Sequence, residues 1–259
     1  MKDVIDRNFR EYFKTSYLVK SVEAKNEWRE EKEYSLFCTS LPHFFFNTVM
    51  MRSGFTIREE QISPIKDFFT QQNLPFSLWC DVLDLDEEAL GVCERHQLAL
   101  LAEQDFTYTR PAGSKMSMDE RVKRVTTPEE WKNWLVPFME VFEFPLGGSV
   151  EQFLFEWGMV NMKKSPEEFI NFYIEEKGEV ASVCSLYVTG RYAGVYNMAT
   201  LEKFRRLGLG RYLVSTIIEY CRENNIEAVG GLGSSMGMEL YKNFDIEVAG
   251  KIQLRAFIN

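Results

Sequence analysis

Two strand-like runs joined by a very short turn constrain the fold of this 259-residue chain more than any other feature. Val180–Val188 and Tyr192–Thr200 are rich in β-branched and aromatic residues, and Thr189-Gly190-Arg191 between them has the length and the glycine of a hairpin turn. Strands joined so tightly pair in antiparallel fashion. The sequence therefore predicts an antiparallel hairpin in the second half of the chain.

A glycine-rich loop follows the second run directly. It reads Phe204-Arg205-Arg206-Leu207-Gly208-Leu209-Gly210-Arg211, and apolar residues then recur at helical spacing as far as Asn224. Two glycines let the backbone approach a ligand closely, and the start of a helix presents unpaired N–H groups to it. Because Arg205, Arg206 and Arg211 add guanidinium groups suited to phosphate oxygens, the loop is predicted to bind an anion.

Two common phosphate-binding motifs do not fit this loop. A Walker loop ends in Gly-Lys-Ser/Thr, which is absent here. A dinucleotide fingerprint needs a third glycine and a parallel βαβ unit, which a loop that follows a hairpin does not offer.

The remaining pattern, Arg-x-x-Gly-x-Gly after an antiparallel strand, resembles the pyrophosphate-binding motif of the GCN5-related N-acetyltransferase (GNAT) superfamily. The resemblance covers roughly residues 122–257 and implies an α+β fold with a mixed, mostly antiparallel sheet flanked by helices. It also implies acetyl-CoA as the donor substrate. The residues that it places on the cofactor are Met198, Ala199, Thr200, Arg205, Arg206, Leu207, Gly208, Leu209, Gly210 and Arg211, the last five through their amides on the diphosphate.

The segment after a further expected strand, Ile226–Leu232, is similar to the closing part of the family pattern, in which a tyrosine follows a short helix. By this resemblance Tyr241 is the general acid that protonates the departing CoA thiolate. Ser235, at the start of that helix, is expected to contact the cofactor or to cap the helix. The sequence departs from the family just beyond, where Asp245-Ile246 replaces the usual Gly-Phe pair.

The first half resembles the family less. A break at Arg110-Pro111-Ala112-Gly113-Ser114 suggests a boundary between residues 1–115, a degenerate GNAT-like domain without a CoA loop, and residues 116–259, the acetyltransferase domain. Since no Arg-x-x-Gly-x-Gly precedes Arg205, at most one cofactor per chain is expected.

Two further segments carry the signals of a helix start. Thr127-Pro128-Glu129-Glu130 combines a capping hydroxyl, a proline and acidic residues, and Ser165-Pro166-Glu167-Glu168 repeats the combination. The second signal predicts a helix over Phe169–Glu176. Trp131, Trp134 and Phe138, at helical spacing, are expected to form a buried stripe.

Composition limits the classes of partner. With 30 basic and 39 acidic residues the net charge is -9, which argues against nucleic acid. Five scattered cysteines without CxxC spacing and only two histidines indicate reduced thiols and no metal site. A charged N-terminus and the absence of a long apolar run favour a soluble, cytoplasmic protein with no membrane partner, expected as a monomer or homodimer.

The resemblance implies transfer of an acetyl group to a primary amine, on a small molecule or a peptide, by direct attack on the thioester. The alternative is a non-catalytic CoA-binding sensor or scaffold protein. Residues Phe142–Lys164 and part of the first half are expected to build the acceptor pocket. The sequence assigns no general base.

Overall fold

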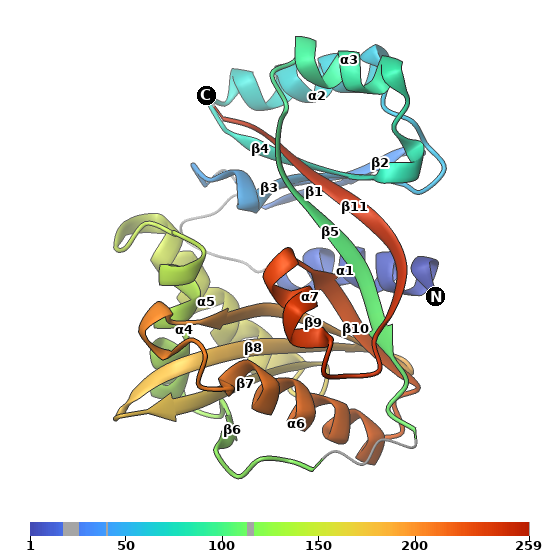
Figure 1. Cartoon of the computed structure of the whole chain (residues 1–259). Coiled ribbons are helices and arrows are strands. Elements are labelled where there is room, and N and C mark those ends of the chain that lie inside the picture. Colours follow the sequence, from blue (N-terminus) through green and yellow to red (C-terminus); the bar gives the residue numbers. More distant parts are fainter. Residues whose placement is uncertain (18–25, 40, 113–116, 259) are drawn as a thin grey trace.

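The structure is a computed structural model that describes residues 1–17, 26–39, 41–112 and 117–258. One sheet of eleven strands runs through the described chain in the order β1-β2-β3-β4-β11-β5-β10-β9-β8-β7-β6 (Figure 1). Its neighbouring strands are antiparallel except for the pairs β3·β4 and β9·β10. The predicted α+β class with a mixed, mostly antiparallel sheet is confirmed.

The strands are β1 (Glu27–Glu30), β2 (Tyr34–Cys38), β3 (Asn47–Met51), β4 (Phe76–Asp81), β5 (Ala99–Thr109), β6 (Val122–Arg124), β7 (Phe169–Glu176), β8 (Glu179–Thr189), β9 (Tyr192–Thr200), β10 (Ala228–Gly233) and β11 (Glu247–Phe257). The α-helices are α1 (Lys2–Tyr17), α2 (Glu59–Gln71), α3 (Glu87–Arg95), α4 (Pro128–Val141), α5 (Gly148–Lys164), α6 (Leu209–Glu223) and α7 (Ser235–Tyr241). Three short 3-10 helices are η1 (Phe44–Phe46), η2 (Val82–Asp84) and η3 (Glu202–Phe204).

The two halves of the chain repeat one order of elements. The first half runs β1-β2-β3-α2-β4-α3-β5, and the second runs β7-β8-β9-α6-β10-α7-β11. From β1 at one end of the sheet and from β7, next to β6, at the other, corresponding strands follow in the same order, except that the last strands are exchanged. Strand β11 pairs with β4 of the first half, and β5 pairs with β10 of the second half. Figure 1 shows β5 and β11 running side by side from the strands of the first half, at the top, to the strands of the second half, below.

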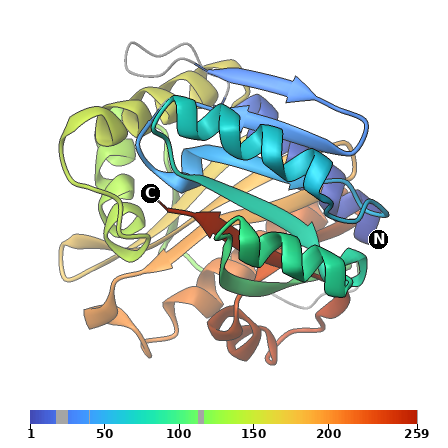
Figure 2. The same cartoon turned by 90° about the horizontal axis from the view of Figure 1, so that it is seen from above.

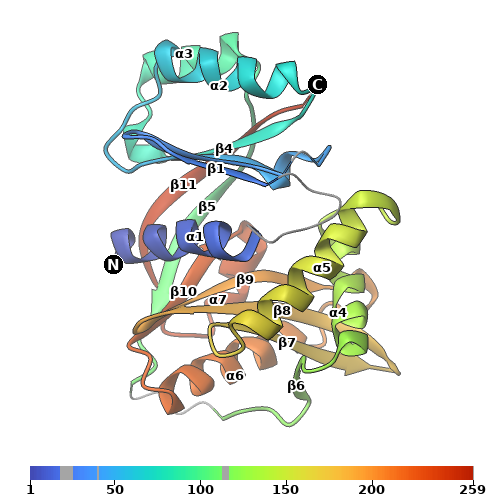
Figure 3. The same ribbon diagram turned by 180° about the vertical axis from the view of Figure 1, so that it is seen from behind.

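Helices cover both faces of this sheet. Helices α2 and α3 lie side by side on the outer side of the first-half strands (Figure 2). Helices α1, α4 and α5 lie on the face of the second-half strands opposite α6 (Figure 3).

Helix α1 comes from the first half in sequence but packs on the second half. It contacts β8, β9, β10 and α5, and buries Ile5, Phe9, Tyr12 and Phe13, which share one helix face. The contact with β9 is so close that a Cβ on Gly194 would lie 2.1 Å from Asn8 Oδ1. A glycine is therefore required where α1 crosses β9.

Helices α4 and α5 form the aromatic part of the core. Trp131, Trp134 and Phe138 are fully buried on α4, as their spacing predicts, and Trp157 on α5 packs against Trp131. The helix start at Thr127 is confirmed, because its hydroxyl accepts the Glu130 N–H at 3.2 Å.

The prediction of a helix over Phe169–Glu176 is wrong, because this segment is strand β7. Its first six residues are all buried, between α4 and α5 on one face and α6 on the other. Burial on both faces suits a run of aromatic and β-branched residues in a strand. The Ser165-Pro166-Glu167-Glu168 signal forms only a turn, in which the Phe169 N–H donates to the Ser165 carbonyl at 2.8 Å.

The predicted domain boundary at residues 115 and 116 falls within 113–116, outside the described residues. The five cysteines are buried and none forms a disulfide. Among the described residues no group of His, Cys, Asp or Glu side chains could hold a metal ion. A search of the same residues finds no helix with the length and apolar character needed to cross a membrane.

Candidate functional site

Strands β9 and β10 separate after a short parallel contact and leave a slot in the sheet. They pair only from Tyr192 to Val195 on β9 and from Ala228 to Gly231 on β10. Beyond these residues β9 pairs only with β8, and β10 only with β5. One edge of the last part of β9 is therefore free of strand partners.

The free edge of β9 presents polar backbone groups to the slot. The Leu201 N–H donates to Ala181, which continues the β8 side, and N–H groups alternate sides along a strand. By this alternation Met198 and Thr200 point their N–H and C=O groups into the slot, whereas Ala199 points toward β8. An extended ligand can hydrogen-bond to Met198 and Thr200 as an added strand would.

The glycine-rich loop stands at the open end of this slot. Phe204 and Leu209 are buried and fix the two ends of the loop, while the residues between them are exposed. Gly208 has a left-handed backbone, with φ of +79°, and forms the N-cap of α6. No described residue accepts a hydrogen bond from the backbone N–H groups of Arg206 to Arg211. Free amides at the start of a helix are able to bind an anion.

Three arginines surround the free amides. Arg205 Nε donates to the Thr200 carbonyl at 3.2 Å, which ties the loop to the end of β9. Arg206 and Arg211 are exposed, and neither forms an ion pair with a described residue. Free cations next to free amides suit a diphosphate group at this end of β9.

Tyr241 ends helix α7, beside α6. Its side chain packs in the apolar cluster below α6 and shares a small hollow with Val195, Ile217 and Gly230. Burial raises the pKa of Tyr241 to about 12, so the hydroxyl keeps its proton at neutral pH. A hydroxyl that keeps its proton is able to donate it to a leaving group.

The start of α7 separates the two serines. Ser234 caps the helix by accepting the Gly237 N–H at 3.2 Å, whereas Ser235 is exposed in the first turn. A Cβ on Gly210 would lie 3.2 Å from Leu240, so α7 packs closely against the start of α6. Ser235 and Tyr241 therefore lie on a helix that packs beside the glycine-rich loop.

Asn197 lies on β9 near the slot and is not among the site residues that the sequence predicts. Three steps along β9, from Tyr196 to Ala199, face two steps along β8, from Ser185 to Val183, so β9 has a bulge there. Asn197 lies in this bulge with a positive φ of 54°. An asparagine inside a β-rich run is the signal that could have indicated it, since asparagine tolerates this conformation.

The corresponding loop of the first half is closed by its own side chains. The Arg58 N–H at the start of α2 donates to Gln61 Oε1 at 2.8 Å, and Gly54 N–H donates to Asp84 at 2.7 Å. Glu59 and Glu60 occupy the first turn of α2. Acidic residues at a helix start repel an anion that would otherwise bind there.

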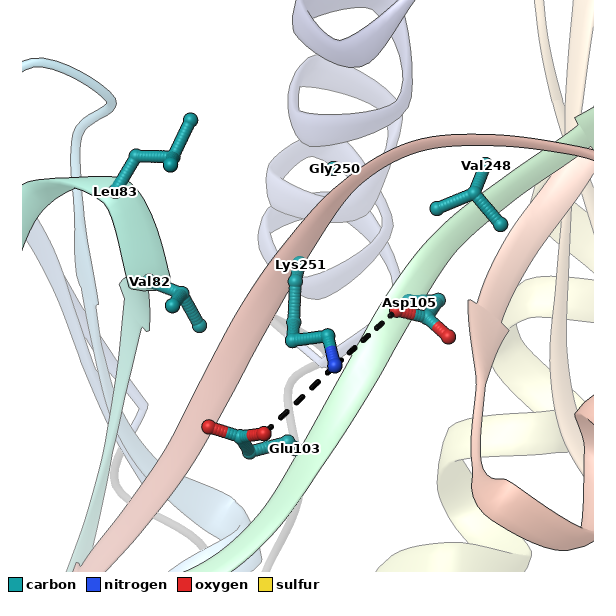
Figure 4. A pocket seen from close by; sticks show the side chains of 7 residues that line it. All are labelled: Val82, Leu83, Glu103, Asp105, Val248, Gly250 and Lys251. Carbon is teal, nitrogen blue, oxygen red and sulfur yellow. Dashed lines mark ion pairs between the residues drawn. The ribbon is translucent and has the colours of Figure 1, made fainter.

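A hollow of about 500 Å³ lies elsewhere, lined by residues of η2, β5 and β11 (Figure 4). Lys251 stands between Glu103 and Asp105, at 3.8 Å and 3.9 Å, with Leu83 and Val248 at the rim. It offers no row of free amides and no arginine. We therefore place the candidate site at the slot rather than at this larger hollow.

Known proteins resemble this chain both in sequence pattern and in fold. Residues 129–243 match the model of the acetyltransferase (GNAT) family. No curated protein sequence matches the chain.

Solved structures share the whole fold at low sequence identity. A functionally unknown conserved protein from Staphylococcus epidermidis is 14% identical, with a TM-score of 0.66 over 95% of this chain and 99% of that one. A GCN5-related N-acetyltransferase from Kribbella flavida is 12% identical, with a TM-score of 0.66 over 97% and 95%. A tandem GNAT protein from the clavulanic acid biosynthesis pathway is 11% identical, with a TM-score of 0.57 over 95% and 86%. Residues 129–243 thus match the acetyltransferase (GNAT) family, and the solved structures extend the likeness in fold to the whole chain.

Proposed function

We propose that this protein transfers the acetyl group of acetyl-CoA to a primary amine, on a small molecule or a peptide, by direct attack of the amine on the thioester. The family match over residues 129–243 supports the general part of this proposal, which is an acyltransferase with acetyl-CoA as its donor. The observation that carries the proposal is the slot beside β9 with the free amides of Arg206 to Arg211 at its open end.

Each predicted site residue has a part in this proposal. The amides from Leu207 to Arg211 hold the diphosphate, assisted by the side chains of Arg205, Arg206 and Arg211. The backbone of Met198 and Thr200 pairs with the pantetheine arm, and Ala199 supports it from the β8 side. Ser235 lies at the start of α7, within the wall of the same site.

The chemical step uses two groups of the chain. The Met198 N–H stabilises the negative charge that develops on the thioester oxygen as the amine attacks. As the C–N bond forms and the C–S bond breaks, the Tyr241 hydroxyl donates a proton to the departing CoA thiolate. The amine attacks in its neutral form and releases a proton to water, from which the tyrosine is protonated again. The net charge of -9 favours approach of a cationic amine, which is consistent with an amine acceptor.

The test measures CoA thiol release with acetyl-CoA and a panel of butylamine, tyramine, aniline and a lysine-containing peptide. We expect release that depends on at least one amine, together with the acetylated amine in mass spectrometry. Acetyl-CoA binding without amine-dependent release from any member would contradict the transferase proposal and favour a CoA-binding sensor or scaffold.

A further inference from the structure

Asn197 has an unusual conformation for the middle of a central strand. Its φ of +54° lies in the left-handed region, which costs most non-glycine residues about 1–2 kcal/mol. The same residue forms the bulge where β9 turns its free edge to the slot. Such a conformation persists only where surrounding contacts hold it.

Hydrogen bonds of the Asn197 side chain stabilise this backbone conformation. Asn197 Nδ2 donates to Tyr12 Oη on α1 at 2.7 Å and lies 3.2 Å from Ser185 Oγ on β8. Ser185 Oγ in turn donates to Asn171 Oδ1 on β7 at 2.7 Å, and both residues are buried. The bulge is thus tied to the neighbouring strands and, separately, to α1.

Tyr12 is itself rigidly placed. Its ring stacks on the Tyr196 ring with centroids 4.1 Å apart and an interplanar angle of 11°, and only 1% of the residue is exposed. A buried hydroxyl in such a position contributes a hydrogen bond of fixed direction. Tyr12 therefore offers Asn197 in the bulge a hydrogen-bond acceptor at a fixed position.

We propose that Tyr12 and Asn197 are a positioning pair, which holds the β9 bulge so that the Met198 N–H points at the thioester carbonyl. The inference rests on the proposed function for the role of Met198. Neither side chain is assigned a contact with the donor; both act through the backbone that follows the bulge. Helix α1 thereby becomes part of the catalytic apparatus of the second half.

Two substitutions remove the pair without forbidding the backbone conformation. Tyr12→Phe deletes the hydroxyl and keeps the stacked ring. Asn197→Gly deletes the side chain, and glycine adopts positive φ readily. Tyr187→Phe is the matched control, because the Tyr187 hydroxyl accepts a hydrogen bond from Thr15 of the same helix at 2.7 Å without touching the bulge.

The kinetic measurement uses acetyl-CoA and whichever panel amine gives the highest rate. Each variant is expected to lower kcat about tenfold, with the KM for acetyl-CoA within about twofold of wild type, because a small misplacement of a reacting group is costly. The double variant should be no slower than the slower single variant, since the two residues act as one unit. Tyr187→Phe should keep kcat within about twofold. Unchanged kcat in both single variants would overturn the proposal.

Hydrogen exchange of the ligand-free protein gives a readout that does not depend on acetyl transfer. Backbone amides of residues 194–201 should exchange at least fivefold faster in Tyr12→Phe and Asn197→Gly, because about 1 kcal/mol of hydrogen bonding is lost. Residues 76–81 of β4 and the Tyr187→Phe protein should exchange at the wild-type rate. Equal exchange of residues 194–201 in all proteins would overturn the positioning pair, whereas absence of amine acetylation by the wild type would contradict only the proposed function.

Discussion

At the scale of single residues, Gly208 is a position where the donor site should not tolerate a larger side chain. A valine there would have to adopt a φ of +79°, and its branched side chain would stand beside the free amides of the loop. We expect Gly208→Val to weaken CoA binding at least tenfold in calorimetry. Gly190→Val carries a comparable strain in the β8–β9 turn, with a φ of +58° and open space around it, and should bind CoA normally. If the two variants bind CoA with equal affinity, the loop is not part of the CoA site.

Tyr241 offers a second test at this scale. If its hydroxyl protonates the thiolate, Tyr241→Phe should lower kcat about 100-fold with near-normal affinity for CoA, a loss typical of general acids. Tyr220→Phe is a suitable comparison, because Tyr220 on α6 packs on Phe172 of β7 and its pKa is also raised by burial. Full activity of Tyr241→Phe would show that the hydroxyl is structural.

At the scale of elements, the close contact between α4 and α5 requires a glycine at position 158, where there is no room for a side chain. A Cβ on Gly158 would lie 1.9 Å from the fully buried Trp131 ring, which has no room to move. Gly158→Ala should therefore lower the free energy of unfolding by about 2 kcal/mol in urea titrations, although alanine favours helices. Gly91→Ala on α3 meets only the flexible Arg95 side chain at 3.3 Å, and should be neutral or slightly stabilising.

The start of α4 predicts an acid-sensitive contribution to stability. Glu130 accepts hydrogen bonds from the Thr126 and Thr127 N–H groups, at 2.8 Å and 2.9 Å, and from the Thr126 hydroxyl; they lower its pKa from 4.5 to about 2. A lowered pKa in the folded protein stabilises it above pH 4.5, and this contribution is lost as the pH falls toward 2. The melting temperature should therefore fall less in Glu130→Gln than in the wild type when the pH is lowered from about 5 to about 3, because the glutamine has no proton to bind. An identical fall in both proteins would contradict the assignment.

Local patterns in the sequence predict the elements that local physics decides. The hairpin Val180–Thr200, the glycine loop and the cap at Thr127 depend on neighbours within a few residues, and the structure has each of them. Strand β7 was mistaken for a helix because its burial on both faces is decided by α4, α5 and α6. The Tyr12 contact with Asn197 spans 185 residues, and no local pattern encodes it.

At the scale of the whole molecule, the repeated halves differ in the one feature that decides stoichiometry. The α2 start carries Glu59 and Glu60 and its loop amides are used internally, so a second CoA has no cradle. Calorimetric titration should give one CoA per chain. Two equivalent sites would contradict the contrast between the α2 and α6 starts.

The exchange of β5 and β11 was also beyond sequence reasoning, because it depends on which of several free strand edges each strand meets. It bears on how the chain is made. During synthesis β4 and β5 leave the ribosome with a gap between them that only β11 fills, more than 130 residues later. At a translation rate of about 5–20 residues per second, the two strand edges wait for several seconds or longer. A nascent chain halted before Glu247 should therefore be open to chaperones and proteases throughout, and both halves should become protected together once β11 has emerged.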